Sequence, residues 1–227
     1  MKRPRNRTAW LSLAREGWLF LLPPLLAGLL FLALGWGLMG LAALGAAAFI
    51  AHFFRDPERA IPQAARCVVS PADGRVVEIR TADDGCPELG GATQVVSIFL
   101  SLWDVHVNRA PCAGRAQRVE YTPGRFLAAF RAEASQANER NTIVVDAAGT
   151  PIAVTQIAGV LARRIVCWVH PGDNLERGQR IGLIRFGSRT EVTLPASATL
   201  LVEEGAKVKG GSTILARLAP EGEARAT

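Results

Sequence analysis

The sequence GDNLERGQRI, residues 172–181, has a counterpart further along the chain in GAKVKGGSTI, residues 205–214. Both stretches fit the form G-x-x-[LV]-x-x-G-x-x-I, in which each glycine permits a turn between two short strands. The repeat therefore predicts short β-strands joined by tight turns in this part of the chain.

Short runs with period-2 alternation extend this pattern upstream, from residue 55 onward. Many are rich in Val, Ile and aromatic residues, and Gly, Pro, Asp or Asn separate them. Pro123–Asn138 is the one segment with a helical pattern, although it lacks a convincing cap. We therefore expect a mostly β domain, barrel-like or sandwich-like, with hammerhead-like repeats. The candidate strands are Cys67–Ser70, Arg75–Arg80, Gln94–Leu102, Ala116–Tyr121, Thr142–Val145, Ile152–Gln156, Arg164–Val169, Arg180–Phe186, Thr190–Leu194 and Thr213–Leu218.

Glycine repeats of this form also occur in lipoyl- and biotinyl-carrier domains and in membrane-anchored adaptor proteins. A carrier presents an exposed lysine at a hairpin tip, whereas the lysines after Lys2 are Lys207 and Lys209, both inside a repeat unit. A carrier role therefore has little support. A membrane-anchored, non-catalytic adaptor with a lipoyl/biotinyl-like β domain is the alternative interpretation of the chain.

No Asp, Glu, Lys or Arg occurs between Gly17 and Phe54. This run exceeds the roughly 7–15 apolar residues of a signal peptide and the roughly 20 residues of one membrane-spanning helix. Gly35-Trp36-Gly37 offers a turn near its middle. The sequence thus predicts a membrane-associating helical hairpin over 17–54, between a basic tail at 1–16 and a domain at 55–227. One long tilted helix with an interfacial continuation also fits.

The net charge of +6 is concentrated in the basic tail. An anionic membrane surface attracts such a segment with about 1 kcal/mol per cation. Because Arg55 and Arg59 follow the apolar run, the positive-inside tendency places both termini and the domain on the cytoplasmic face of the cell membrane. The domain has little excess charge, so we expect no nucleic-acid partner. The cations of the tail are Lys2, Arg3, Arg5, Arg7 and Arg15.

The four cysteines show neither C-x-x-C spacing nor a nearby histidine. We therefore expect no zinc or other metal, and instead buried, reduced thiols in a cytosolic setting. These cysteines are Cys67, Cys86, Cys112 and Cys167.

A general base is most easily sought among three histidines. His52 ends the apolar run and is most simply an interfacial residue, and His170 begins a turn. His106 follows Asp104 by two positions, and on a strand the two side chains would share one face. A carboxylate there could orient the imidazole and support its cationic form.

Two predicted strands flank the sequence RFGSR, residues 185–189. Through this sequence and five further blocks, the chain resembles the shorter class of the phosphatidylserine decarboxylase family. The resemblance covers nearly the whole chain, and its blocks stand in the family's order. These blocks are FFRDPER (53–59), SPADGRV (70–76), DVHVNRAP (104–111), NERN (138–141), QIAG (156–159) and GLIRFGS (182–188).

The resemblance implies a zymogen that cleaves itself and carries a pyruvoyl prosthetic group. The Ser188 hydroxyl would attack the Gly187 carbonyl, and β-elimination and hydrolysis would leave a pyruvoyl group derived from Ser188. This ketone would form a Schiff base with the amino group of phosphatidylserine and withdraw electrons as CO2 departs. The product would be phosphatidylethanolamine, so the resemblance implies a pyruvoyl-dependent carboxy-lyase of phospholipid biosynthesis.

In the family, a histidine and aspartates activate the serine, and the matching positions are His106, Asp73 and Asp104. The longer class has a second histidine where this chain has Arg109, which cannot act as a base at neutral pH. Arg109 instead suits a substrate phosphate or carboxylate. We also assign Asn108 and Asn141 to substrate binding.

Two Gly-Ser bonds are candidates for the cleavage. Gly211-Ser212 is followed by threonine as in the longer class, but it falls inside a repeat unit, where a plain turn explains it. Cleavage at Gly187-Ser188 gives a large chain of residues 1–187 and a small chain of residues 188–227, which is long enough to stay within the sheet. We therefore expect these two chains to remain together as a heterodimer that acts on phosphatidylserine in the bilayer, with homo-oligomerisation left open.

Overall fold

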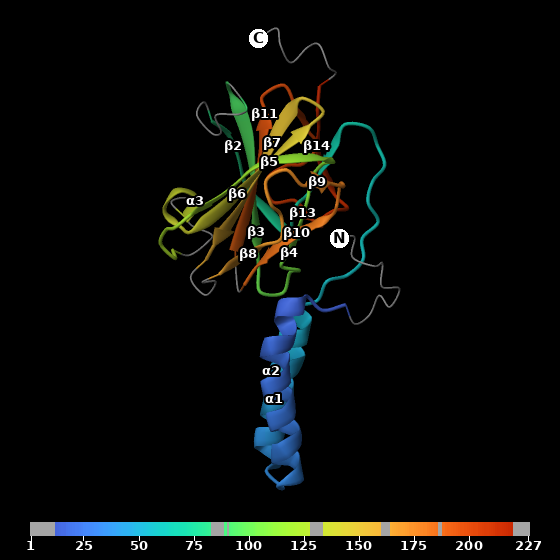
Figure 1. The fold of residues 1–227 in the computed structure, drawn as a ribbon. Helices are drawn as coiled ribbons and strands as arrows, with labels where there is room; N and C mark the ends of the chain where they lie inside the picture. Colours follow the sequence, from blue (N-terminus) through green and yellow to red (C-terminus); the bar gives the residue numbers. More distant parts are fainter. Residues whose placement is uncertain are drawn as a thin grey trace. The chain divides into compact units, whose positions relative to one another are not determined.

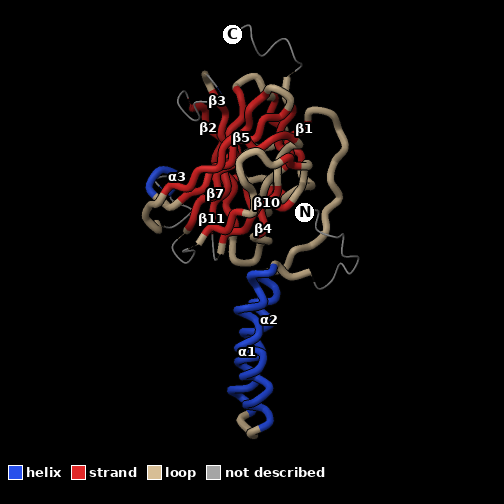
Figure 2. Tube along the Cα trace, in the orientation of Figure 1, coloured by secondary structure: helices blue, strands red, loops and turns tan. Residues whose placement is uncertain are grey.

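The computed structural model describes residues 12–82, 89, 91–127, 134–159, 164–185 and 188–219 (Figure 1). The chain divides into two compact units, Met1–Glu58 and Arg59–Thr227. The first is helical and the second is built from β-strands (Figure 2).

The first unit is a helical hairpin of α1 (Arg15–Ala33) and α2 (Gly37–Phe53). Gly35 has a φ of +77° and makes the turn between them. Close packing follows from small residues, because a Cβ at Gly28 would lie 2.8 Å from the Leu44 side chain and one at Gly40 would lie 2.6 Å from Leu32. The predicted hairpin is confirmed.

The outer surface of this hairpin is apolar. Leu19 and Leu38 are 76% and 84% exposed, and most other large side chains of the two helices also face outward. A contiguous apolar surface of this kind is typical of a membrane contact. By length and composition α1 could cross a bilayer, while α2, at 17 residues, is shorter than a usual span.

The second unit contains three antiparallel sheets. The largest has the order β13-β2-β3-β11-β7-β6-β5-β9, and the two smaller sheets have the orders β1-β14-β12 and β4-β10-β8. The strands are β1 (Cys67–Val69), β2 (Gly74–Ala82), β3 (Thr93–Leu100), β4 (Val107–Arg109), β5 (Gly114–Thr122), β6 (Arg140–Ala147), β7 (Thr150–Ala158), β8 (Ile165–Cys167), β9 (Asn174–Leu175), β10 (Arg180–Ile184), β11 (Ser188–Pro195), β12 (Thr199–Leu200), β13 (Lys207–Val208) and β14 (Ile214–Arg217).

The mostly β prediction is confirmed, and each predicted strand overlaps an observed one. The helix predicted at Pro123–Asn138 is wrong at its start and correct near its end, and its residues 128–133 lie outside the described residues. Residues 123–127 are not helical, Arg125 pairs with Asn138 in a parallel bridge, and the helix α3 covers Ala134–Ala137. No cap fixed a helix start in the sequence, and the described apolar residue Phe126 packs on Ala158 and Ile184.

The glycine repeat corresponds to a repeat in three dimensions. The Gly178 N–H donates to the Ala110 carbonyl at 2.8 Å, and the Gly211 N–H donates to the Ser70 carbonyl at 2.7 Å. Each unit also supplies a two-residue strand, because β9 pairs with β5 and β13 pairs with β2. Both glycines have a positive φ, of +75° and +77°, which explains why glycine occupies them.

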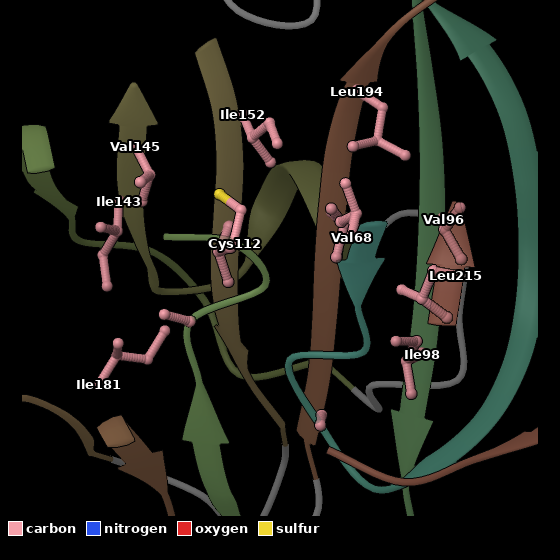
Figure 3. Packing of buried hydrophobic residues seen from close by; sticks show 14 of the residues in the cluster. Val68, Val96, Ile98, Cys112, Ile143, Val145, Ile152, Ile181, Leu194 and Leu215 are labelled. Carbon is pink, nitrogen blue, oxygen red and sulfur yellow. The ribbon is translucent and has the colours of Figure 1, made fainter. Parts of the chain in front are cut away.

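The core of this unit lies between the large sheet and the two small ones (Figure 3). It is formed by branched aliphatic side chains such as Ile98 and Leu215, together with the Cys112 thiol. Burial raises the pKa of Cys112 to about 12, so this thiol stays protonated and acts as a small apolar residue. Cys67 and Cys112 are buried free thiols as expected, Cys167 is a half-buried one, and Cys86 lies outside the described residues.

Candidate active site

Ser188 begins β11 in the middle of the large sheet. Its backbone pairs with Leu100 of β3 on one side and with Ala158 of β7 on the other. The side chain is fully buried, and its hydroxyl has no hydrogen-bond partner among the residues that the structure describes. A buried hydroxyl without a partner is destabilising, so its place in the middle of the sheet calls for an explanation. Gly187 and Phe186, which precede it, lie outside the described residues.

His106 lies just before β4 and is 2% exposed. Its Nδ1 is 3.0 Å from the backbone carbonyl oxygen of Asp104. Because a carbonyl oxygen only accepts hydrogen bonds, Nδ1 carries the hydrogen. In the neutral imidazole, Nε2 is then the atom that can take a proton.

The strand register brings His106 and Ser188 to the same end of the domain. Asn108 donates to the Thr190 hydroxyl at 3.2 Å, and His106 and Ser188 each lie two residues back from these contact points. The His106 carbonyl accepts a hydrogen bond from Ile184 at 3.3 Å, and Ile184 packs on Ala158, the register partner of Ser188. On β11, Ser188 and Thr190 share one face because strand side chains alternate.

A chain of buried amides supports this pair. Asn141 donates to Gln156 at 3.1 Å, Gln156 donates to Asn108 at 2.9 Å, and Asn108 donates to Thr190. All four side chains are at most 4% exposed. The amides of Asn108 and Asn141 thus bond to other side chains of the protein, an arrangement that fixes β4 against β6, β7 and β11.

Asp104 does not lie on a strand, which was the condition for its side chain to share a face with that of His106, because β3 ends at Leu100 and a turn follows. Its carboxylate accepts hydrogen bonds from the N–H of Ser101 at 2.8 Å and from its hydroxyl at 2.6 Å. The carboxylate closes this turn, and the backbone carbonyl of Asp104 holds the imidazole of His106. Strand alternation does not apply here, because the Asp104 carboxylate binds the Ser101 backbone N–H and forms a turn.

Asp73 precedes Gly74, the first residue of β2, and its carboxylate is bound on both oxygens. Arg59 donates to Oδ2 at 2.6 Å, and the Gly210 N–H donates to Oδ1 at 2.8 Å. The segment PADG at 71–74 is matched by PCAG at 111–114 in the other half of the β unit. Ala113 occupies the place equivalent to Asp73, so the turn itself does not need a carboxylate.

Arg109 is buried with its guanidinium near the two repeat turns. It donates to the Gly178 carbonyl at 3.0 Å, and a Cβ at Gly211 would lie 2.9 Å from its Cδ. On β4 it is adjacent to Asn108, so its side chain leaves the other face of the strand. The described contacts thus place Asp73 and Arg109 around the repeat turns, and place Asn108 and Asn141 in the amide chain that reaches Thr190 on β11. An anionic substrate group would reach Arg109 only from the side of the repeat turns.

The sequence interpretation missed three members of this site. Arg59 was read only as a topology signal, although it pairs with Asp73. Gln156 and Thr190 join the amide chain. Their register, in which Asn141 faces Gln156 and Gln156 faces Thr190, is the signal that could have identified them.

The structure defines a class of protein: a mostly β domain that buries a serine and a histidine at one end, following an apolar helical hairpin. Comparison with known families assigns it more closely. Residues 46–216 match the phosphatidylserine decarboxylase family, and the chain belongs to that family.

Curated relatives cover most of the chain. The chain is 49% identical over 208 residues to the phosphatidylserine decarboxylase proenzyme of Symbiobacterium thermophilum, an alignment that spans 91% of this chain and 95% of the relative. It is 45% identical over 207 residues to the proenzyme of Burkholderia pseudomallei strain K96243, with the same coverage. The proenzyme of Desulfotalea psychrophila is 44% identical over 174 residues, or 76% of this chain and 81% of the relative.

Proposed function

We propose that this chain is a self-processing phosphatidylserine decarboxylase that forms phosphatidylethanolamine and CO2. The observation that carries the proposal is the buried Ser188 hydroxyl, which lacks a described hydrogen-bond partner and lies at the same end of the domain as His106. Membership of the phosphatidylserine decarboxylase family supports the reaction, and the relatives are proenzymes, which are cleaved before they act. Ser188 and His106 are suited to this cleavage as nucleophile and base.

In the first stage the Ser188 hydroxyl attacks the Gly187 carbonyl, and the amide becomes an ester. His106 Nε2 takes the hydroxyl proton and returns it to the Ser188 nitrogen, which becomes an amine. β-Elimination then removes the Cα proton of residue 188 to a base and breaks its Cβ–O ester bond, so that Gly187 leaves as a carboxylate and residue 188 becomes a dehydroalanine. Hydrolysis of this enamine releases ammonia and leaves a pyruvoyl group at position 188.

The buried space at the start of β11 suits that group, because replacing the hydroxyl by a ketone there removes a donor that has no described partner. When present, the pyruvoyl carbonyl supplies an electron sink for decarboxylation. His106 is the residue we assign as the proton donor to the carbon that loses CO2. The amides of Asn108 and Asn141 hold β4 and its preceding turn in place, and Arg109 remains our assignment for an anionic substrate group.

The position of β11 supports a lasting heterodimer of the two chains. After cleavage, the small chain 188–227 would begin with a strand that lies between β3 and β7. On the face opposite Ser188, Arg189 is almost fully buried and donates to the Ser135 hydroxyl at 2.8 Å. These backbone pairs and side-chain contacts would hold the new N-terminus in register without any covalent link.

We further infer that the hairpin attaches the enzyme to the cell membrane, with the β unit on the cytoplasmic face. The apolar outer surface of α1 and α2 and the basic tail at 1–16 support this placement. The adaptor alternative, with hammerhead-like repeats and no catalysis, shares the same architecture. It does not explain a buried serine hydroxyl without a described partner.

Intact-mass measurement of the purified full-length chain tests the proposal. We expect two chains in place of the 24.3 kDa precursor, with a blocked N-terminus at position 188 and release of CO2 from phosphatidylserine vesicles. Ser188→Ala is the matched control and should remain one inactive chain. A single uncut chain in the wild type would favour the adaptor, whereas cleavage without CO2 release would indicate a processed but inactive relative.

A further inference from the structure

The turn between β3 and β4 presents two apolar side chains at its tip. The Asp104 N–H donates to the Ser101 carbonyl at 3.0 Å, so Leu102 and Trp103 occupy the central positions. Such positions usually hold Gly, Pro, Asn, Asp or Ser. Trp103 is nevertheless 67% exposed, more than any other large apolar side chain described in the unit that begins at Arg59.

This turn is held rigidly and is joined directly to the site. The Asp104 carboxylate accepts two hydrogen bonds from Ser101, which closes the turn a second time. The carbonyl of the same Asp104 accepts the hydrogen bond from His106 Nδ1. One short segment therefore exposes an indole on the surface and orients the buried imidazole three residues later.

The neighbouring surface combines cations with apolar groups. The backbone N–H of Arg185 donates to the backbone carbonyl of the exposed Arg164 at 3.3 Å. The backbone N–H of the adjoining Ile184 donates to the His106 carbonyl. Phe126 and Ile165 are partly buried and pack on Ala158 and Ile184 at the same end of the domain. β4, β8 and β10 meet there (Figure 1).

We propose that Leu102 and Trp103 insert into the interfacial region of an anionic bilayer and hold the His106 site at the membrane surface. An indole combines a large apolar ring with one N–H donor, which suits the headgroup level of a bilayer. Arg164 and Arg185 complement its negative charge. This contact belongs to the β unit and is additional to the hairpin. It rests on the proposed function only for the identity of the lipid that enters the site.

Depth-dependent fluorescence quenching tests the contact without relying on catalysis. The full-length chain has five tryptophans, so the emission of Trp103 is obtained as the difference between the wild type and Trp103→Phe. With vesicles of brominated phosphatidylserine we expect most of this difference emission to be quenched. The matched control is Trp168→Phe, since Trp168 is half-buried and its backbone N–H donates to the backbone carbonyl of Ile181 within the β unit. The emission difference for Trp168 should stay unquenched.

A second measurement connects the contact to substrate access. Trp103→Asp should raise the apparent KM for phosphatidylserine in mixed vesicles several-fold and change kcat far less. Leu201→Asp, at another exposed apolar side chain, should change neither parameter.

Unquenched Trp103 emission would overturn the proposal even in a fully active enzyme. If Trp103→Asp lowered only the oligomer mass, the tip would contact a second copy of the chain, and the proposal would again be wrong. An enzyme that released no CO2 but showed quenched Trp103 emission would keep this contact and reject the proposed function instead.

Discussion

Glycine precedes serine at two places in this chain, and the two pairs lie in contrasting surroundings. Ser188 is fully buried between β3 and β7, and its hydroxyl has no described partner. Ser212 is half-buried in a turn, where its N–H donates to the Lys209 carbonyl at 3.0 Å. The same dipeptide thus leaves a hydroxyl available for chemistry in one place and forms an ordinary turn in the other.

The contrast shows that the surroundings, more than the motif, determine what a Gly-Ser pair can do. The Gly211 turn has an equivalent at Gly178, with matching backbone hydrogen bonds and a similar φ. Ser188 has no counterpart in that repeat. The internal repeat explains the glycine–serine pair at Gly211, whereas it leaves Ser188 unexplained.

The largest effect is expected for Ser188→Ala, which removes the nucleophile and should abolish cleavage completely. The same change removes a buried hydroxyl without a described partner, so the uncut variant should be at least as stable as the wild type. Its free energy of unfolding should rise by up to about 1 kcal/mol, and its unfolding temperature should not fall. Intact mass and thermal unfolding check the two expectations. A strongly destabilised variant would mean that the hydroxyl has a structural role.

His106→Ala should have the next largest effect. Losing a general base typically slows a reaction by about 10²–10⁴-fold, so mostly precursor should remain after purification. The matched control is His170→Ala, an exposed residue on a loop, which should process like the wild type. Normal cleavage of His106→Ala combined with lost decarboxylation would confine His106 to the second stage.

Asp73→Ala should slow processing less than His106→Ala does, because Asp73 bonds to Arg59 and Gly210 and its described contacts do not include the serine. Removing one partner of this part-buried ion pair also destabilises the fold, so this variant must be compared with Arg59→Ala. Equal processing defects in both variants would assign Asp73 a structural role. A larger defect in Asp73→Ala would show that the carboxylate itself contributes to cleavage, as we expect.

The sequence predicted the elements of the fold better than their contacts. The hairpin followed from an uncharged run with glycines at its middle, and the long strands followed from alternation. β4, β9, β12 and β13 have two or three residues each, too few for a period to be visible. The helix predicted at Pro123–Asn138 shows the same limit, because without a cap its start was placed at residues that are not helical.

The site was predictable only in part, for a related reason. Ser188 and His106 were chosen from the sequence, but their shared location depends on the register between β4, β10, β7 and β11, which no local pattern contains. The shared face considered for Asp104 and His106 was not found, because β3 ends at Leu100 and Asp104 lies in the turn that follows. Arg59 lies close to Asp73 in sequence, but only the folded chain shows that they form an ion pair.

Removing the hairpin should have a small effect on cleavage and a large one on solubility. A variant that begins at Arg55 keeps Arg59 and all described contacts of Ser188 and His106, so it should still process itself. It loses the apolar outer surface of α1 and α2, whose exposure to water costs about 25 cal/mol per Å². Sedimentation with membranes and intact mass check both expectations. A variant that still sediments with membranes would indicate a second membrane contact.

The smallest effect is expected for Ser212→Ala, which should process like the wild type. In the repeat, Gln179 occupies the position equivalent to Ser212, so the turn does not depend on a serine. The turn is instead held by the Gly211 N–H and by Thr213, whose hydroxyl accepts from the Lys209 N–H at 2.9 Å.

Gly211→Ala is the informative companion, because a Cβ there meets Arg109 and Ile61 at about 3 Å and the φ is +77°. It should lower the unfolding temperature and still leave the cut before position 188. A fragment beginning at residue 212, or an unblocked serine at position 188, would reverse the comparison and identify the turn as the site of cleavage.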